Sequence, residues 1–183
     1  LAGIIRNNVQ RVNEVIENVL QLSRRDRARP EPVELRPWVT RLAEEARRAN
    51  RLDEGQIVVT VSPEDATLFT DPRQMGQVVT VLLENAVTHY SGDRSGLSIR
   101  VSGGLAADGT PFLEVGDNGP GIPEDAQARI FEPFFSTRRN GTGLGLYLAR
   151  ELSEGCGVRP DNVPAPDGGS RFRLSFPDQR LLV

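Results

Sequence analysis

Residues 134–146 combine side chains and spacing that could bind a phosphorylated ligand. Two aromatic residues are followed by a polar basic stretch and then by glycine at every second position. These residues are Phe134, Phe135, Arg138, Arg139, Gly141, Gly143 and Gly145. Glycines at this spacing let the backbone approach a ligand and expose its N–H groups, and a helix opening at Gly143 would add an anion site. The motif alone equally fits a flexible loop before an ordinary helix.

A helix-end asparagine offers a ligand for a divalent cation. Asn85 lies in the run Glu84–His89, at the end of a predicted helix. An amide oxygen suits Mg²⁺ as a single protein ligand, because this ion keeps several waters and also takes phosphate oxygens. Taken by itself, Asn85 equally fits an ordinary polar residue at a helix end.

The run Asp117–Pro123 follows a predicted strand and is rich in glycine and proline. A carboxylate at a strand end can accept a hydrogen bond from an adenine amino group, and Gly119 and Gly121 would leave room for the flat base. The same residues are strong turn formers, so a purely structural turn is the alternative.

The elements around these motifs predict one α+β domain. Apolar spacing predicts helices over residues 37–50, 72–90 and 143–155. Strands are predicted over residues 33–35, 57–61, 68–70, 97–102, 112–115 and 170–176, with a turn at 103–109 and irregular chain at 116–142. Because no regular βαβ repeat is present, we expect a two-layer α/β sandwich, in which helices cover one face of a mixed, mostly antiparallel sheet.

A separate helix is predicted ahead of this domain. Apolar residues recur every three or four positions through residues 1–28, which predicts an amphipathic helix about 40 Å long. Such a stripe needs partner helices, although packing on its own domain is an alternative. Charged residues and two prolines predict a linker at 29–32, so the domain would occupy 33–183. Because the sequence opens inside a helical pattern, we expect it to be part of a longer protein.

Composition excludes several classes of chemistry. All 22 basic residues are arginine, so any cationic contact to phosphate must come from arginine. The single cysteine, Cys156, cannot form an internal disulfide, and the single histidine, His89, excludes multi-histidine metal sites. The net charge of −3 gives no electrostatic reason to expect nucleic acid as a partner.

Taken together, the motifs resemble the conserved boxes of sensor histidine kinases. Asn85 on a helix, Asp117-x-Gly-x-Gly, Phe131–Phe135 and Gly141–Leu146 follow the order of the N, G1, F and G2 boxes. Each motif is weak alone, but four in the right order are specific. The resemblance covers about residues 33–176 and is nearest the nitrogen-regulator and pilus-regulator branch. Residues 1–28 resemble the second helix of the family's dimerization and histidine-phosphotransfer hairpin.

This resemblance implies a GHKL-type ATP-binding catalytic domain and a role for each matching residue. Asn85 would hold Mg²⁺ against the triphosphate of ATP, and Asp117 would recognise the adenine amino group. The base pocket would be shaped by Gly119, Gly121 and Ile122. The other nucleotide contacts implied are His89, Phe134, Arg138, Arg139, Gly141, Thr142, Gly143, Leu144, Gly145 and Leu146.

Three departures from the family pattern matter. Val81 stands where ATP-hydrolysing relatives place a glutamate that activates water, which argues for a transferase because valine is no base. Thr88 stands where the family often has a cationic residue. The phosphoacceptor box is absent, and His89 is expected to line the pocket rather than to accept the phosphoryl group. A GHKL-type ATP hydrolase and a degenerate nucleotide-binding docking module remain as alternatives.

The resemblance also implies partners. We expect γ-phosphoryl transfer from ATP to a histidine on a dimerization helix absent from this chain, followed by relay to a response-regulator receiver domain. The full-length protein would be a homodimer, with this part cytoplasmic and its parent in some cases anchored in the bacterial inner membrane. ADP would be the other nucleotide bound.

Overall fold

The computed structural model describes residues 16, 28–138, 141–165 and 168–176. The predicted helix over residues 1–28 therefore lies almost wholly outside the described residues, and so does Arg139. Among the helices that are described, none combines the length and the apolar character needed to cross a membrane.

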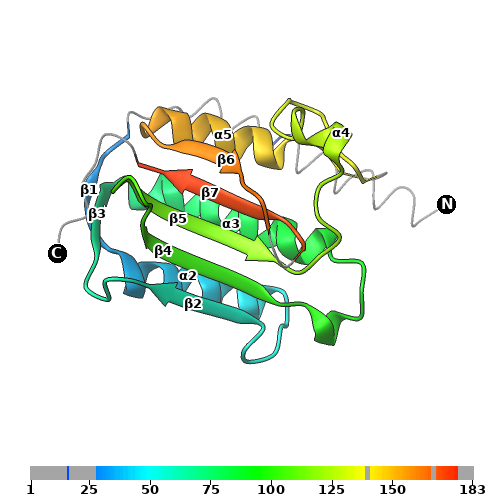
Figure 1. Cartoon of the computed structure of the whole chain (residues 1–183), viewed down its shortest axis with the longest axis horizontal. Coiled ribbons are helices and arrows are strands. Elements are labelled where there is room, and N and C mark those ends of the chain that lie inside the picture. Colours follow the sequence, from blue (N-terminus) through cyan, green and yellow to red (C-terminus); the bar gives the residue numbers. More distant parts are fainter. Residues whose placement is uncertain (1–15, 17–27, 139–140, 166–167, 177–183) are drawn as a thin grey trace.

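A five-stranded sheet forms one layer of the domain (Figure 1). Its strands, in spatial order, are β2 (Ile57–Val61), β4 (Ile99–Leu105), β5 (Pro111–Asp117), β7 (Arg171–Ser175) and β6 (Arg159–Asn162). Only β2 and β4 pair in parallel, and the other neighbours are antiparallel. The expected mixed, mostly antiparallel sheet is confirmed.

Three helices form the second layer on one face of this sheet. They are α2 (Leu35–Ala49), α3 (Pro72–His89) and α5 (Gly145–Gly155). Figure 1 shows the strands in front of α2 and α3, so these helices lie on one face of the sheet, and among the described residues no helix covers the opposite, open face. The core lies between the layers, where Phe172 and Leu174 of β7 are buried against the helices while Arg171 and Arg173 alternate onto the open face.

The helix α3 begins at a strong cap. Asp71 accepts hydrogen bonds at 3.0 Å from the backbone N–H groups of both Arg73 and Gln74, and Pro72 occupies the first helical position. The second carboxylate oxygen accepts the Arg29 N–H at 2.9 Å. These bonds hold the pKa of Asp71 below its usual value despite burial, which raises it. The chain that enters the domain is therefore fastened to the start of α3.

A two-stranded sheet and two short helices complete the described elements. The strands β1 (Glu31–Glu34) and β3 (Thr67–Thr70) pair antiparallel just before Asp71. The 3₁₀ helix η1 (Arg94–Gly96) precedes β4, and α4 (Glu124–Gln127) interrupts the irregular region after β5. The predicted domain start at residue 33 falls inside β1.

Some expected boundaries and elements were wrong. Gly103 and Gly104 lie inside β4 rather than in a turn, and a Cβ at Gly103 would lie 2.6 Å from Leu35 Cδ2, so the missing side chain lets α2 pack closely. The helix α5 begins at Gly145 rather than Gly143. The edge strand β6 was not predicted, because its sequence Arg-Pro-Asp-Asn has no apolar alternation and proline is tolerated only at such an edge.

Candidate functional site

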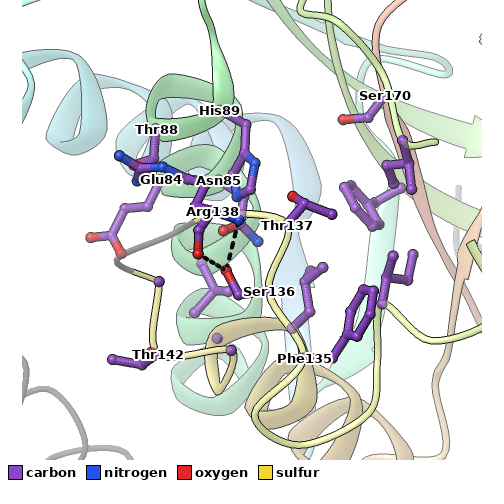
Figure 2. A pocket seen from close by; sticks show the side chains of 18 of the residues that line it. Glu84, Asn85, Thr88, His89, Phe135, Ser136, Thr137, Arg138, Thr142 and Ser170 are labelled. Carbon is purple, nitrogen blue, oxygen red and sulfur yellow. Dashed lines mark hydrogen bonds between the residues drawn. The ribbon is translucent and has the colours of Figure 1, made fainter. Parts of the chain in front are cut away.

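A cavity of about 580 Å³ lies between α3, the loop after β5 and the loop before α5. Cavities of this size usually bind small molecules. Figure 2 shows Glu84, Asn85, Thr88 and His89 on α3, facing the loop that carries Ser136–Arg138, with Ser170 set apart from them. Segments far apart in the sequence therefore meet at one place.

Most of the predicted site residues line this cavity. They are Asn85, His89, Asp117, Gly121, Ile122, Arg138, Gly141, Thr142, Gly143, Gly145 and Leu146. The structure places three others elsewhere. Gly119 is not on the cavity wall, but its N–H donates to Asp117. Leu144 is buried in the core, and the side chain of Phe134 is 72% exposed. Phe135, rather than Phe134, lies on the cavity wall.

The Asp117 carboxylate is held in a defined orientation. Its Oδ1 accepts the Gly119 N–H at 2.7 Å and the Ser170 N–H at 3.3 Å. Its Oδ2 accepts a short hydrogen bond from the Ser170 hydroxyl. A carboxylate offers only acceptors, so this half-buried group presents an oriented acceptor to a donor within the cavity.

Gly169 allows the backbone around Asp117 to pack closely. It has φ +80°, and a Cβ built on it would lie 1.8 Å from the Asp117 carbonyl oxygen. The sequence analysis missed both Gly169 and Ser170, although Gly168-Gly169 ahead of a strand is a visible turn signal. Only the pairing of β5 with β7 reveals that these residues reach Asp117.

The loop before α5 is closed at its base by a backbone contact. The Phe134 N–H donates to the Gly143 carbonyl at 2.9 Å. Gly143 has φ +67°, and a Cβ there would lie 2.4 Å from the Phe134 carbonyl carbon, so only glycine fits. Arg129 lies over the Phe135 ring at 4.6 Å from its centroid. Phe134 and Gly143 are therefore joined directly, and Gly143 lies on the cavity wall.

Asn85 is half-buried in the cavity wall, and its Nδ2 is a buried donor without a partner within the described residues. A buried polar group without a partner is costly, so this amide fits a site that a polar ligand completes. No group of three or more acidic, histidine or cysteine side chains that could hold a metal occurs in the described ranges. The Asn85 amide oxygen can supply a single ligand to a cation that takes its other ligands from phosphate and water.

His89 faces two opposite charges in the cavity. Burial of part of its imidazole and the nearby Arg138 guanidinium lower the pKa of His89, while the Asp117 carboxylate acts in the opposite direction. With a pKa below its usual value of 6.5, the ring is neutral at pH 7.

A titration of His89 checks this electrostatic arrangement. Because His89 is the only histidine, its imidazole signals in an NMR titration need no assignment by mutation. We expect a pKa below 6.5 in the free protein, and a higher value in R138Q, since that change removes a positive charge. R129Q is the control. Arg129 is exposed and is not among the groups that shift the pKa of His89, so this change should leave that pKa unchanged. An unchanged value in R138Q would contradict the arrangement.

Comparison with known proteins gives the family. The sequence profile described as "Histidine kinase-, DNA gyrase B-, and HSP90-like ATPase" matches residues 70–180, which is more than half of the chain. The chain belongs to this family. The match contains α3, the glycine-rich loop and β7, and hence every segment that lines the cavity.

The related proteins are sensor kinases. The sensor protein kinase PilS of Pseudomonas aeruginosa is 42% identical over 185 residues, covering 100% of this chain and 34% of PilS. The sensory histidine kinase/phosphatase NtrB of Rhodobacter capsulatus is 31% identical, covering 97% of this chain and 52% of NtrB. The chain thus spans about a third to a half of the length of these relatives. The expected resemblance to sensor histidine kinases is confirmed.

Solved structures share the fold of this ATPase-family domain. Full-length ShkA in complex with AMPPNP aligns with a TM-score of 0.77 at 24% identity, covering 97% of this chain and 37% of ShkA. Histidine kinase ThkA, in complex with response regulator protein TrrA, aligns with a TM-score of 0.73 at 22% identity. This alignment covers 98% of this chain and 50% of the solved chain. The chain therefore has the α+β fold of histidine kinase catalytic regions.

Proposed function

We propose that this chain is the ATP-binding catalytic domain of a sensor histidine kinase. It would transfer the γ-phosphoryl group of Mg-ATP to a histidine supplied by a dimerization helix outside this sequence. The observation that carries the proposal is the convergence of Asn85, Asp117 and the Gly141–Gly145 loop on one cavity, within the residues that match the family profile.

Adenine recognition would depend on Asp117. Its orientation by Gly119 and Ser170 leaves a carboxylate acceptor for the amino group of the base. Gly121 and Ile122 line the same part of the cavity and would contact the flat ring. A site that orients a buried acceptor in advance discriminates strongly against a base without the matching donor.

The phosphates would bind at the start of α5. This 11-residue helix has no acidic residue in its first turn and no side-chain cap, so the N–H groups of the first turn are available to an anion. Gly141, Gly143 and Gly145 line the adjoining cavity wall, and Arg138 adds a positive charge. Phosphoryl transfer depends mainly on positioning and charge stabilisation, which these groups would supply.

Mg²⁺ would be held by Asn85 together with phosphate oxygens and water. The Asn85 amide lies in the cavity wall, where its oxygen would ligate the ion and its partnerless Nδ2 would donate to a phosphate oxygen. When bound, the ion would neutralise phosphate charge. Asn85 would thereby hold the triphosphate in a fixed position relative to α3.

Transfer to a protein is favoured over hydrolysis. Val81 lines the cavity one turn before Asn85 and lies against the start of α5, where a Cβ on Gly145 would be 3.4 Å from Val81 Cγ1. An aliphatic side chain cannot activate water. The only histidine, His89, lies in the cavity wall, so the acceptor histidine must come from another segment.

The proposed partners follow from the relatives. ThkA was solved with a response regulator protein, and PilS and NtrB are sensor kinases. By analogy this domain would act within a homodimer, phosphorylate a histidine on the helical hairpin that residues 1–28 would help to form, and serve a response-regulator receiver domain. Its parent would place it in the cytoplasm, beside a membrane anchor where the parent has one.

Incubation with γ-labelled ATP and Mg²⁺ tests the proposal. The chain alone should acquire no lasting label of the acid-labile kind that phosphohistidine gives. A separately expressed acceptor hairpin, when added, should become labelled. N85A should slow that labelling by about 100-fold, because charge stabilisation by a bound metal contributes several kcal/mol. N162A, on the edge strand β6, serves as the control and should label at the normal rate.

Two outcomes would contradict the proposal in different ways. Stable label on this chain alone would show that the acceptor is present within it. Rapid release of phosphate without any acceptor hairpin would instead show a hydrolase.

A further inference from the structure

The open face of the sheet contains a second, smaller hollow. Its volume is about 190 Å³, and it lies on the sheet face opposite α2 and α3 (Figure 1). The side chains around it come mainly from β4, β5 and β7, namely Arg100, Ser102, Glu114 and Arg171, with Ser98 just before β4. Neither the family match nor the relatives' names assign anything to this position.

The strand register explains why the hollow exists. Arg100 of β4 is paired with Gly116 of β5, and Gly116 is paired in turn with Arg171 of β7. Neighbouring strands are about 4.8 Å apart, so the two arginine Cα atoms are about 10 Å apart, with no side chain between them. Two long guanidinium side chains thus flank a gap that a small ligand can fill.

Two arginines and two carboxylates border the gap, and each carboxylate already has hydrogen-bond donors of its own. Glu114 is only 7% exposed, and its two oxygens are occupied by Arg171 Nη1 at 3.3 Å and Arg173 Nε at 2.8 Å. Asp117, which borders the hollow, already accepts from Gly119 and Ser170. Both carboxylates are therefore satisfied without the help of Arg100.

Donors remain unused around the gap. In the Arg171 guanidinium, Nη1 donates to Glu114 and Nη2 to the Pro164 carbonyl, which leaves the buried Nε as its one nitrogen without a hydrogen-bond partner in the described ranges. Arg100 is exposed, and no hydrogen bond or ion pair is found for its guanidinium among the described residues. The Ser98 and Ser102 hydroxyls border the same space and are also donors. Guanidinium and hydroxyl donors around one hollow match the oxygens of a tetrahedral anion.

We propose that this hollow binds a small oxyanion of the phosphate class, held between Arg100 and Arg171. The site is separate from the nucleotide cavity, and its existence does not depend on the proposed kinase activity. The two cavities share a wall, since Asp117 and Ser170 border both. An anion on the open face would therefore contact the segment that orients the Asp117 carboxylate.

Titration with inorganic phosphate, at constant ionic strength maintained with chloride, tests the proposal. Binding is followed by NMR through the arginine Nε–H signals and the backbone signals of β4 and β5. We expect saturable binding that is weakened at least about fivefold in R100Q, a change that removes one charge-assisted contact. R159Q, an exposed arginine on edge strand β6 and outside the hollow, is the matched control and should bind phosphate normally.

Two further variants keep the outcome decisive. G116V fills the gap without removing a charge and should likewise weaken binding, while the backbone should tolerate it because a Cβ at Gly116 meets nothing closer than 3.7 Å. R138Q changes only the nucleotide cavity and should leave this binding unchanged. Phosphate binding that survives both R100Q and G116V, or that is lost in R138Q, would overturn the proposal.

Discussion

Asparagine in place of Asp117 should weaken ATP binding by about 100-fold and reverse the preference for the base. The two backbone donors at Oδ1 keep the amide oxygen on that side, so the NH₂ group must replace Oδ2. The carboxylate oxygen that would accept from the adenine amino group is thereby replaced by an NH₂ donor facing another donor. This replacement should weaken the free energy of ATP binding by about 2–3 kcal/mol. Inosine triphosphate carries an acceptor at the same ring position and should lose no affinity.

Calorimetry with non-hydrolysable ATP and ITP analogues, on the wild type and on D117N, measures both effects. D108N is the matched control, because Asp108 is an exposed turn residue that accepts from the Thr110 N–H and lies far from the cavity wall. An equal loss of affinity for both nucleotides would show that Asp117 only maintains the local structure. Unchanged ATP affinity would remove Asp117 from the site altogether.

Alanine at position 169 should nearly abolish nucleotide binding, whereas alanine at the neighbouring position 168 should not. Both glycines have positive φ, +82° at Gly168 and +80° at Gly169, so alanine costs a similar backbone strain of about 1 kcal/mol at each. A Cβ at Gly168 meets nothing within 4 Å, while one at Gly169 would lie 1.8 Å from the Asp117 carbonyl oxygen. G169A must therefore displace the Asp117 segment, and G168A need not.

We expect the free energy of unfolding of G169A to be about 1–3 kcal/mol lower than that of G168A, which is the usual cost of overpacking. The nucleotide affinity of G169A should be at least about 30-fold lower than that of the wild type. Urea unfolding gives the first quantity and nucleotide calorimetry the second. The comparison with G168A removes the contribution of φ alone. Equal affinity in the two variants would show that the close packing at Asp117 is not needed for binding.

The local motifs of the site were predictable from the sequence. Asn85, Asp117 and the glycine-rich loop each carry their chemistry in contiguous residues, and the structure brings all three to one cavity. The cap of α3 was equally readable, since Asp71-Pro72 ahead of an apolar helical pattern has a direct physical meaning. The alternation of apolar and polar residues along β7 likewise identified its buried face.

Other features depend on contacts that no local pattern contains. Ser170 reaches Asp117 only because β7 pairs with β5, and its sequence neighbours indicate no more than a turn. The strand β6 exists because β7 offers it an edge, not because of its own composition. Phe134 is exposed whereas Phe135 lines the cavity, and the φ of +65° at Phe134 occurs where its N–H bonds to the distant Gly143.

The pairing of β5 with β7 also sets the order in which the protein can mature. Asp117 and Ser170 are separated by 53 positions, and their hydrogen bonds form only after the intervening loop, α5 and β6 have been laid down. Loop-closure entropy makes such distant contacts late events in folding. A chain emerging from the ribosome thus acquires an ordered Asp117 carboxylate only after β7 has been synthesised. Nucleotide that binds the completed domain would then stabilise it over unfinished chains by mass action.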